Sequence, residues 1–471
     1  MVCVGRGLGL WDFGLFRVQS ACMPNRILYG LCSCFLALFF WDSFVNGADE
    51  PLAETVKKDF RDFINYATQN YEVDIKKYLE ARKKERFADW KKASEVGIPE
   101  GQFLCGECYF NGIGIPENKA EAAAWFRKAA EQENAEGQWR LGMCYLYGQG
   151  VTKNGAEATK WFRKAAEQGF APSQHEIGFA YFRGRNVPEN KTEAANWYLK
   201  AAEQGFAPSQ YELALCYLRA HGVSEDEREA SKWFRKAAEQ GHRNAQSEIG
   251  KRYFYGIGIP EDKTEAAKWL SKNAEHGDAE VQFLLGRCYL EGSDAPNATE
   301  EAVNWFRKAA EQGNAEAQVK LAEHCFKGEG VPKSETEAIK WYRKAAGQGH
   351  AEAQYTLGMH FYKGRFGPED KTEAVSWFRK AAEQNHAEGQ YRLGWCYLFG
   401  HGIRRDDVEA VEWFRKAAEQ GNANGQHLLG ECYAAGWGVL ENREEATKWL
   451  RKAAEQGVKQ AADLLREIEA N

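Results

Sequence analysis

The residues of this chain best suited to chemistry are its cysteines and histidines. Six cysteines share one position of a recurring pattern, and four other residues fill that position elsewhere: Cys108, Cys144, Cys216, Cys288, Cys396 and Cys432, with Ala180, Arg252, His324 and His360. Regularly spaced thiols could form a disulfide ladder. The Cys-x-x-Cys that starts at Cys105, or the pair His324-Cys325, could bind zinc or act in redox chemistry.

The spacing of these residues argues against that chemistry. Equivalent positions in stacked helical repeats lie about 10 Å apart, whereas a disulfide needs Cα atoms within about 7 Å and zinc needs bonds of about 2.0–2.3 Å. We therefore expect structural thiols, with a disulfide ladder as the alternative, and no metal or cofactor. The sequence has no His-Glu-x-x-His, Gly-x-Ser-x-Gly or Walker motif, so we predict no catalytic residues.

The elements that position these residues repeat every 36 residues. The segment that begins at Trp125 returns in ten copies without an insertion, the last at Trp449, and a glutamine keeps the same step from Gln102 to Gln426. A fixed period of about 20–50 residues indicates a solenoid or array. The predicted fold is all-α, with about ten helix-turn-helix repeats and half-repeat caps.

Local signals define two helices in each repeat. In the second copy, an apolar stripe through Leu141 and Tyr145 predicts a first helix over about 135–147. Gly142 lies in a column of glycine or alanine, which lets a neighbouring helix approach closely. Asn154 heads a column of second-helix N-caps, nine of ten with a side-chain acceptor. Ala298 is the exception, and Asn297 beside it is the expected substitute. Glycine or asparagine ends this helix in every copy except at Glu133.

Composition narrows the class of protein. Of 471 residues, 44% are hydrophobic, and the net charge is -6. The hydrophobic content excludes a largely disordered chain. The negative net charge gives no overall electrostatic attraction to nucleic acid or anionic lipid. We predict neither nucleic-acid binding nor membrane insertion of the mature repeat domain.

The chain divides into four predicted segments. Residues 1–47 form a signal peptide or leader, because the apolar run 27–41 follows Arg26 and precedes small residues near Gly47. An uncleaved membrane anchor is the alternative, and Met23 is an alternative start. Residues 48–101 form an N-terminal helical cap, 102–461 the ten repeats, and 462–471 a C-terminal cap helix. We expect export to a periplasm, the secretory lumen or the medium.

The repeat resembles the Sel-1-like repeat, a relative of the tetratricopeptide repeat. The resemblance lies in Ala351-Glu352-Ala353-Gln354, then Leu357, Gly358 and Phe361, then the segment from Trp377 to Gln384, and it covers the ten copies. It implies a right-handed superhelix of helix pairs and a role in holding protein complexes together. The exported cysteine-rich branch of that family has two cysteines per repeat, whereas nearly every repeat here has one.

Variable positions on the first helix are the candidate binding residues. Three columns spaced i, i+4 and i+8 share one helix face, and their large residues are enriched at interfaces. We predict partner contacts at Trp139, Met143, Tyr147, Phe179, Tyr211, Leu215, Tyr355, Met359, Tyr391, Trp395 and Phe399. The first column could instead pack between repeats at Tyr211, Tyr355 and Tyr391. We expect exposure in the second column, at Met143, Phe179, Leu215, Met359 and Trp395.

The predicted function is a non-enzymatic scaffold that binds protein or peptide partners on the concave face of the solenoid. A structural spacer without a specific ligand and, least favoured, an exported cell-wall hydrolase are the alternatives.

Overall fold

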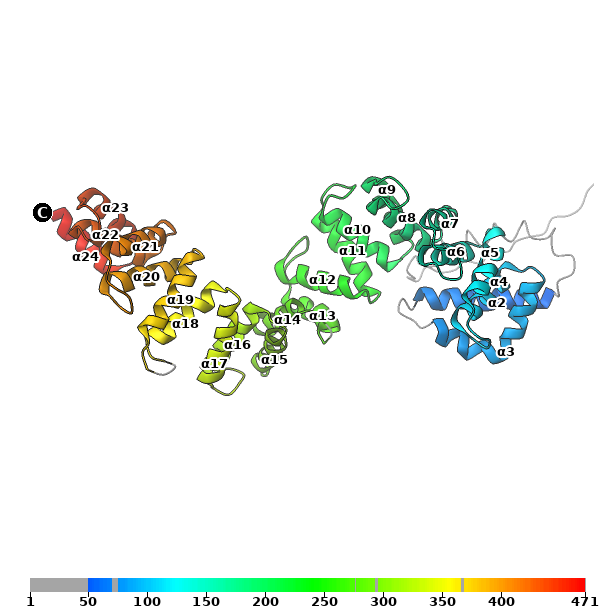
Figure 1. Ribbon diagram of the computed structural model, residues 1–471, viewed down its shortest axis with the longest axis horizontal. Helices are drawn as coiled ribbons and strands as arrows, with labels where there is room; N and C mark the ends of the chain where they lie inside the picture. Colours follow the sequence, from blue (N-terminus) through cyan, green and yellow to red (C-terminus); the bar gives the residue numbers. More distant parts are fainter. Residues whose placement is uncertain (1–49, 70–74, 276, 293–294, 366–367, 471) are drawn as a thin grey trace, which may run out of the picture. The chain divides into compact units, whose positions relative to one another are not determined.

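The computed structural model describes residues 50–69, 75–275, 277–292, 295–365 and 368–470 (Figure 1). The described residues form two compact units, divided between residues 174 and 175. In the described residues every regular element is an α-helix, from α2 to α24. None of these helices combines the length and the apolar content that crossing a membrane requires. The predicted leader lies outside the described residues.

The helices form ten pairs, which we number as repeats one to ten. The first helices are α4 (Pro99–Asn111), α6 (Ala135–Tyr147), α8 (Ala171–Arg183), α10 (Ala207–Leu218), α12 (Arg243–Tyr255), α14 (Ala279–Gly292), α16 (Ala315–Lys327), α18 (Ala351–Tyr362), α20 (Ala387–Phe399) and α22 (Ala423–Ala435). The second helices are α5 (Lys119–Glu131), α7 (Gly155–Glu167), α9 (Lys191–Glu203), α11 (Glu227–Glu239), α13 (Lys263–Ala274), α15 (Ala298–Glu311), α17 (Glu335–Gly347), α19 (Lys371–Glu383), α21 (Asp407–Glu419) and α23 (Arg443–Glu455).

Within each unit a first helix packs on its own second helix, and that second helix packs on the next first helix. The pairs from α16 to α23 follow one another side by side in chain order (Figure 1). This arrangement confirms the predicted α-solenoid of 36-residue repeats. Helix α8 carries the boundary between the units, because residues 171–174 belong to the first unit and the rest of the helix to the second.

The glycine column explains the close packing inside a pair. A Cβ atom at residue 142 would lie 2.5 Å from the ring of Phe162 on α7. Since no side chain tolerates that distance, the ring fills the space that glycine leaves. Phe162 is buried, and burying such a ring contributes about 1.5–3 kcal/mol.

The helix ends follow the predicted caps except at Gly277 and Asn297. Gly277, after α13, is not among the glycines with positive φ, although the other glycines of its column are. Glu133 adopts φ 63°, the left-handed backbone that Gly169 takes at φ 93° in the next repeat. The turn geometry is therefore kept even where glycine is missing. The prediction that Asn297 replaces the missing cap is wrong: its side chain makes no capping hydrogen bond. Its φ and ψ of −101° and 9° are not the extended backbone that aims a cap at the helix.

Three further helices lie at the ends of the array: α2 (Glu50–Gln69), α3 (Ile75–Glu95) and α24 (Lys459–Ala470). Helix α2, in a stretch whose sequence pattern is weak, packs on α3 and α4. Its Phe60 ring lies 5.5 Å from that of Phe103, and its Asp59 accepts a hydrogen bond of 3.0 Å from Trp90 Nε1.

A ladder of glutamines ties each pair to the preceding one. Gln354 Nε2 donates to the carbonyl of Ala346 at 3.0 Å, and its Oε1 accepts from Gln384 Nε2 at 2.7 Å. The same two bonds recur in the first unit at Gln138, with Ala130 and Gln168. In each case one bond joins the first helix of a repeat to the second helix of the preceding repeat. The other bond joins that first helix to the end of the second helix of its own repeat.

Candidate binding surface

The three candidate columns lie on the first helices, and their exposure differs by column. The second-column residues Met143, Phe179, Leu215, Met359 and Trp395 are all half-buried. In the third column, Tyr147 is 61% exposed and Phe399 is 47% exposed. The face therefore presents exposed rings at third-column Tyr147 and Phe399, and parts of large side chains at its second column.

In the first unit the candidate residues lie on α6. Trp139 is half-buried, with its ring 6.0 Å from that of Phe170 and the Arg140 guanidinium 5.0 Å from its centre. Tyr147 stands in the last turn, where Gly148 ends the helix in the left-handed conformation. Trp139 is thus held by packing, while Tyr147 faces solvent.

In the second unit, Phe179 lies on α8 and Tyr211 and Leu215 lie on α10. Arg183 and Arg185 approach the Phe179 ring at 5.8 and 5.2 Å. Tyr211 stacks on the His242 ring at 4.6 Å. Trp139 lies in the first unit, and Phe179, Tyr211 and Leu215 lie in the second.

The first-column tyrosines pack into the structure more than they project from it. Tyr391 is only 8% exposed and belongs to the hydrophobic core of its unit. Tyr355 is half-buried, with ring centres 6.2 Å from Phe378 and 5.1 Å from His386. Burial raises the pKa of the Tyr355 and Tyr391 phenols. These side chains therefore contribute mainly to packing beneath the first-helix face.

Repeats eight and nine carry a continuous row of rings, which we call the aromatic strip: Tyr391, Trp395, Phe399, His401 and Tyr362. Successive ring centres along α20 lie 6.3 Å apart for Tyr391 and Trp395, and 4.4 Å apart for Trp395 and Phe399. His401 follows Phe399 at 6.0 Å, and its Nδ1 lies 2.7 Å from the Tyr362 hydroxyl. Met359 packs against the same core. The strip thus joins α20 to the end of α18.

A family comparison agrees with this geometry. The Sel1 repeat model matches ten consecutive segments, 99–134, 135–170, 171–206, 207–242, 243–278, 279–314, 315–350, 351–386, 387–422 and 423–458. The chain belongs to the Sel1 repeat family. The predicted resemblance is confirmed, and the matched segments begin at the start of each first helix.

Two solved Sel1-type structures are similar to this chain. One is c5321, a protective antigen of uropathogenic Escherichia coli strains with an SLR fold. It shares 35% identity with a TM-score of 0.71, over 90% of this chain and 91% of that one. The other is a Sel1 repeat protein from Oxalobacter formigenes, with 32% identity and a TM-score of 0.55, over 69% of this chain and 93% of that one. No curated protein sequence matches the chain.

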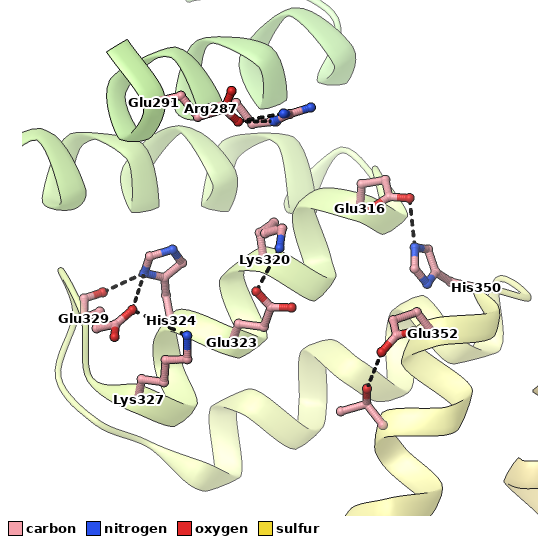
Figure 2. Close-up of polar contacts among 11 residues, drawn as sticks. Arg287, Glu291, Glu316, Lys320, Glu323, His324, Lys327, Glu329, His350 and Glu352 are labelled. Atoms are coloured by element: carbon pink, nitrogen blue, oxygen red, sulfur yellow. Dashed lines mark hydrogen bonds and ion pairs between the residues drawn. The ribbon is translucent and has the colours of Figure 1, made fainter. Parts of the chain in front are cut away.

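Histidine caps are a feature of these Sel1 repeats that the sequence analysis missed. His350 precedes α18 and accepts from the Ala353 amide at Nδ1, 3.2 Å away, so its proton sits on Nε2. That Nε2 lies 3.0 Å from Glu316 of α16 (Figure 2). His386 repeats the arrangement with Glu352 at 2.8 Å. The signal was available, because these histidines share a column with Asn314 and Asn422, which cap in the same way.

The cysteines of the Sel1 array are buried thiols. All eight in the described residues are free. Burial raises the pKa of Cys396 and Cys432 to about 12, so they are protonated at neutral pH. His360, in the same column, has its pKa lowered by burial to about 4. The described residues contain no cluster of ligands that could hold a metal ion.

Proposed function

We propose that this Sel1 protein is a non-enzymatic scaffold that binds protein or peptide partners on the face formed by its first helices. The aromatic strip carries the proposal. Trp395 and Phe399 are one helical turn apart, and Phe399 remains 47% exposed although a buried core lies beneath it. Aromatic residues grouped around a supported centre are typical of interface hot spots.

Isolated exposed apolar residues elsewhere provide the control. Leu440, in the turn before α23, is 90% exposed, and Val408 at the start of α21 is 61% exposed. Single residues of this kind are ordinary on protein surfaces. Neither residue is aromatic, and neither belongs to the row of rings that forms the strip.

The test is partner capture with matched variants of the full chain. Wild type, Trp395→Ala, Trp139→Ala and Leu440→Ala are immobilised and exposed to extract from source cells, and bound proteins are quantified by mass spectrometry. The proposal expects one or more proteins to be depleted by Trp395→Ala or Trp139→Ala and retained by Leu440→Ala. Capture that is equal for all four variants, with unchanged circular dichroism, would contradict it.

The other candidate functions give different outcomes. A structural spacer would capture nothing that distinguishes the variants. A cell-wall hydrolase would form an adduct with a serine- or cysteine-directed covalent probe. Export is a further part of the proposal and rests on the apolar segment 27–41. Sequencing the N-terminus of the mature chain tests it, because cleavage near Gly47 is expected and an intact leader would indicate an anchor.

A further inference from the structure

Two cations lie in repeats eight and nine on the face that bears the aromatic strip: Lys363, which follows α18, and Arg392 of α20. The corresponding positions earlier in the second unit hold Arg183 and Glu212. Burial raises the pKa of Glu212, and the charges of Arg183 and Arg219 oppose that shift. Lys363 and Arg392 occupy the equivalent positions of repeats eight and nine, so a cation replaces the acid.

Neither cation is neutralised within the part of the chain that the structure describes. Lys363 is exposed, and no carboxylate lies within ion-pair distance of it or of Arg392. The Arg392 guanidinium lies 5.0 Å from the Tyr391 ring, and its buried Nε has no hydrogen-bond partner among the described residues. On the preceding turn of α20, Glu388 already accepts from Asn422 at 2.6 Å.

On the same face of repeat seven, the lysines lie close to glutamates that balance their charge. On α16, Lys320 pairs with Glu323 at 3.0 Å, and Lys327 lies 3.9 Å from Glu329 (Figure 2). Repeat five also pairs its second-column lysine, Lys251, with Glu280. Repeats eight and nine therefore differ from repeats five and seven, in which the described cations on this face are paired with carboxylates.

We infer that the aromatic strip binds an acidic peptide segment with an aromatic or aliphatic anchor. The anchor packs on Trp395 and Phe399, while carboxylates of the peptide pair with Lys363 and Arg392. Arginine suits this role because its fork of donors matches a carboxylate. This inference rests on the proposed function and adds the chemistry of the partner.

A peptide fits the charges better than a nucleic acid does. Non-specific nucleic-acid binding neutralises many phosphates with basic side chains. Here Glu352 lies on α18 and Glu388 lies on α20, and the chain has a net charge of -6. Two cations suffice for a short acidic motif.

The probe is a random peptide library displayed on phage and selected on the full chain. Selected peptides are synthesised and their affinities measured by fluorescence polarisation at low and high salt. The variants are Lys363→Glu, Arg392→Gln and Trp395→Ala. Lys340→Glu is the charge control, because Lys340 is exposed on the second helix α17. Since Arg392 is half-buried, thermal unfolding checks that its variant folds, and exposed Lys363 gives an independent test.

The inference expects enriched peptides that combine Asp or Glu with an aromatic or aliphatic residue. Lys363→Glu should weaken binding about tenfold and reduce its salt dependence, Arg392→Gln about as much, and Lys340→Glu less than about twofold. Peptides without acidic enrichment that lose affinity only with Trp395→Ala would overturn the acidic-partner inference and leave the binding face intact. Binding indifferent to Trp395→Ala would overturn the proposed function. Displacement of the peptides by oligothymidylate would replace the acidic peptide with a nucleic acid.

Discussion

The glutamine ladder leads to a quantitative prediction for Gln354→Ala. Gln354 is 4% exposed and makes two hydrogen bonds, one to the Ala346 carbonyl and one from Gln384. The Ala346 carbonyl keeps a bond from the Gly349 amide, so no buried group is left entirely unpaired. Two net hydrogen bonds at about 1 kcal/mol each, with about 1 kcal/mol for the small void, give a destabilisation of about 3 kcal/mol.

Matched variants separate the contributions to that loss. Gln384→Ala removes the inter-glutamine bond and a longer bond of 3.3 Å to the Lys380 carbonyl from an exposed residue. The Lys380 bond is replaced by water, so we expect about 1 kcal/mol. Gln354→Met keeps the volume and loses both bonds, so we expect about 2 kcal/mol. In a double-mutant cycle, Gln354 and Gln384 should show a coupling of about 1 kcal/mol, the value of their shared bond.

The assay must be local, because a repeat array does not unfold as one two-state unit. Hydrogen exchange of α17 and α18, followed by mass spectrometry at native pH, reports the free energy of opening at this junction. A change below about 0.5 kcal/mol for Gln354→Ala, or no coupling with Gln384, would refute the reasoning that these bonds hold adjacent repeats together.

Three other predictions concern backbone strain, pH and thiols. Glu133→Gly should stabilise the first unit by about 1 kcal/mol in urea unfolding, because Glu133 has φ 63°. The control variant Glu131→Gly should destabilise the same unit, because Glu131 is an exposed helical residue. His360 is neutral when folded, since burial lowers its pKa from 6.5 to about 4. Its unfolded form binds more protons, so stability should be full above about pH 6.5 and fall by up to about 3 kcal/mol as pH drops to about 4. His360→Cys should flatten that dependence, and an unchanged pH profile would contradict the assignment. Cys396 and Cys432 should resist a thiol reagent such as dithionitrobenzoate in the native chain and react after denaturation, because burial raises the pKa of each to about 12; rapid native labelling would show that they are accessible.

The regular part of the fold was predictable because each signal recurs in ten copies. Side-chain acceptors such as Asn154 predict helix starts, and Gly142 predicts close packing against the ring of Phe162. Local propensity alone misleads at Glu133, where the two flanking helices impose a conformation that its residue type disfavours. At Asn297 the opposite occurs, since a suitable cap residue lacks the backbone geometry to act.

The binding surface was only partly predictable. Helical spacing places the three columns on one face, but it does not say how deeply each residue packs. Tyr391 is buried by Phe414 and its neighbours, while Phe399 in the same helix stays exposed. The His386 ring also contacts Glu352, which lies 34 residues earlier in the chain. Contacts of that kind exist only once the repeats are stacked.

The most direct test of partner binding by the first-helix face is oxidative footprinting of the chain with and without its captured partner. The account predicts that Trp395 and Phe399 become protected from hydroxyl radicals, while Val408 and Leu440 keep the same rate of oxidation. Protection confined to the second helices, with Trp395 unchanged, would contradict it.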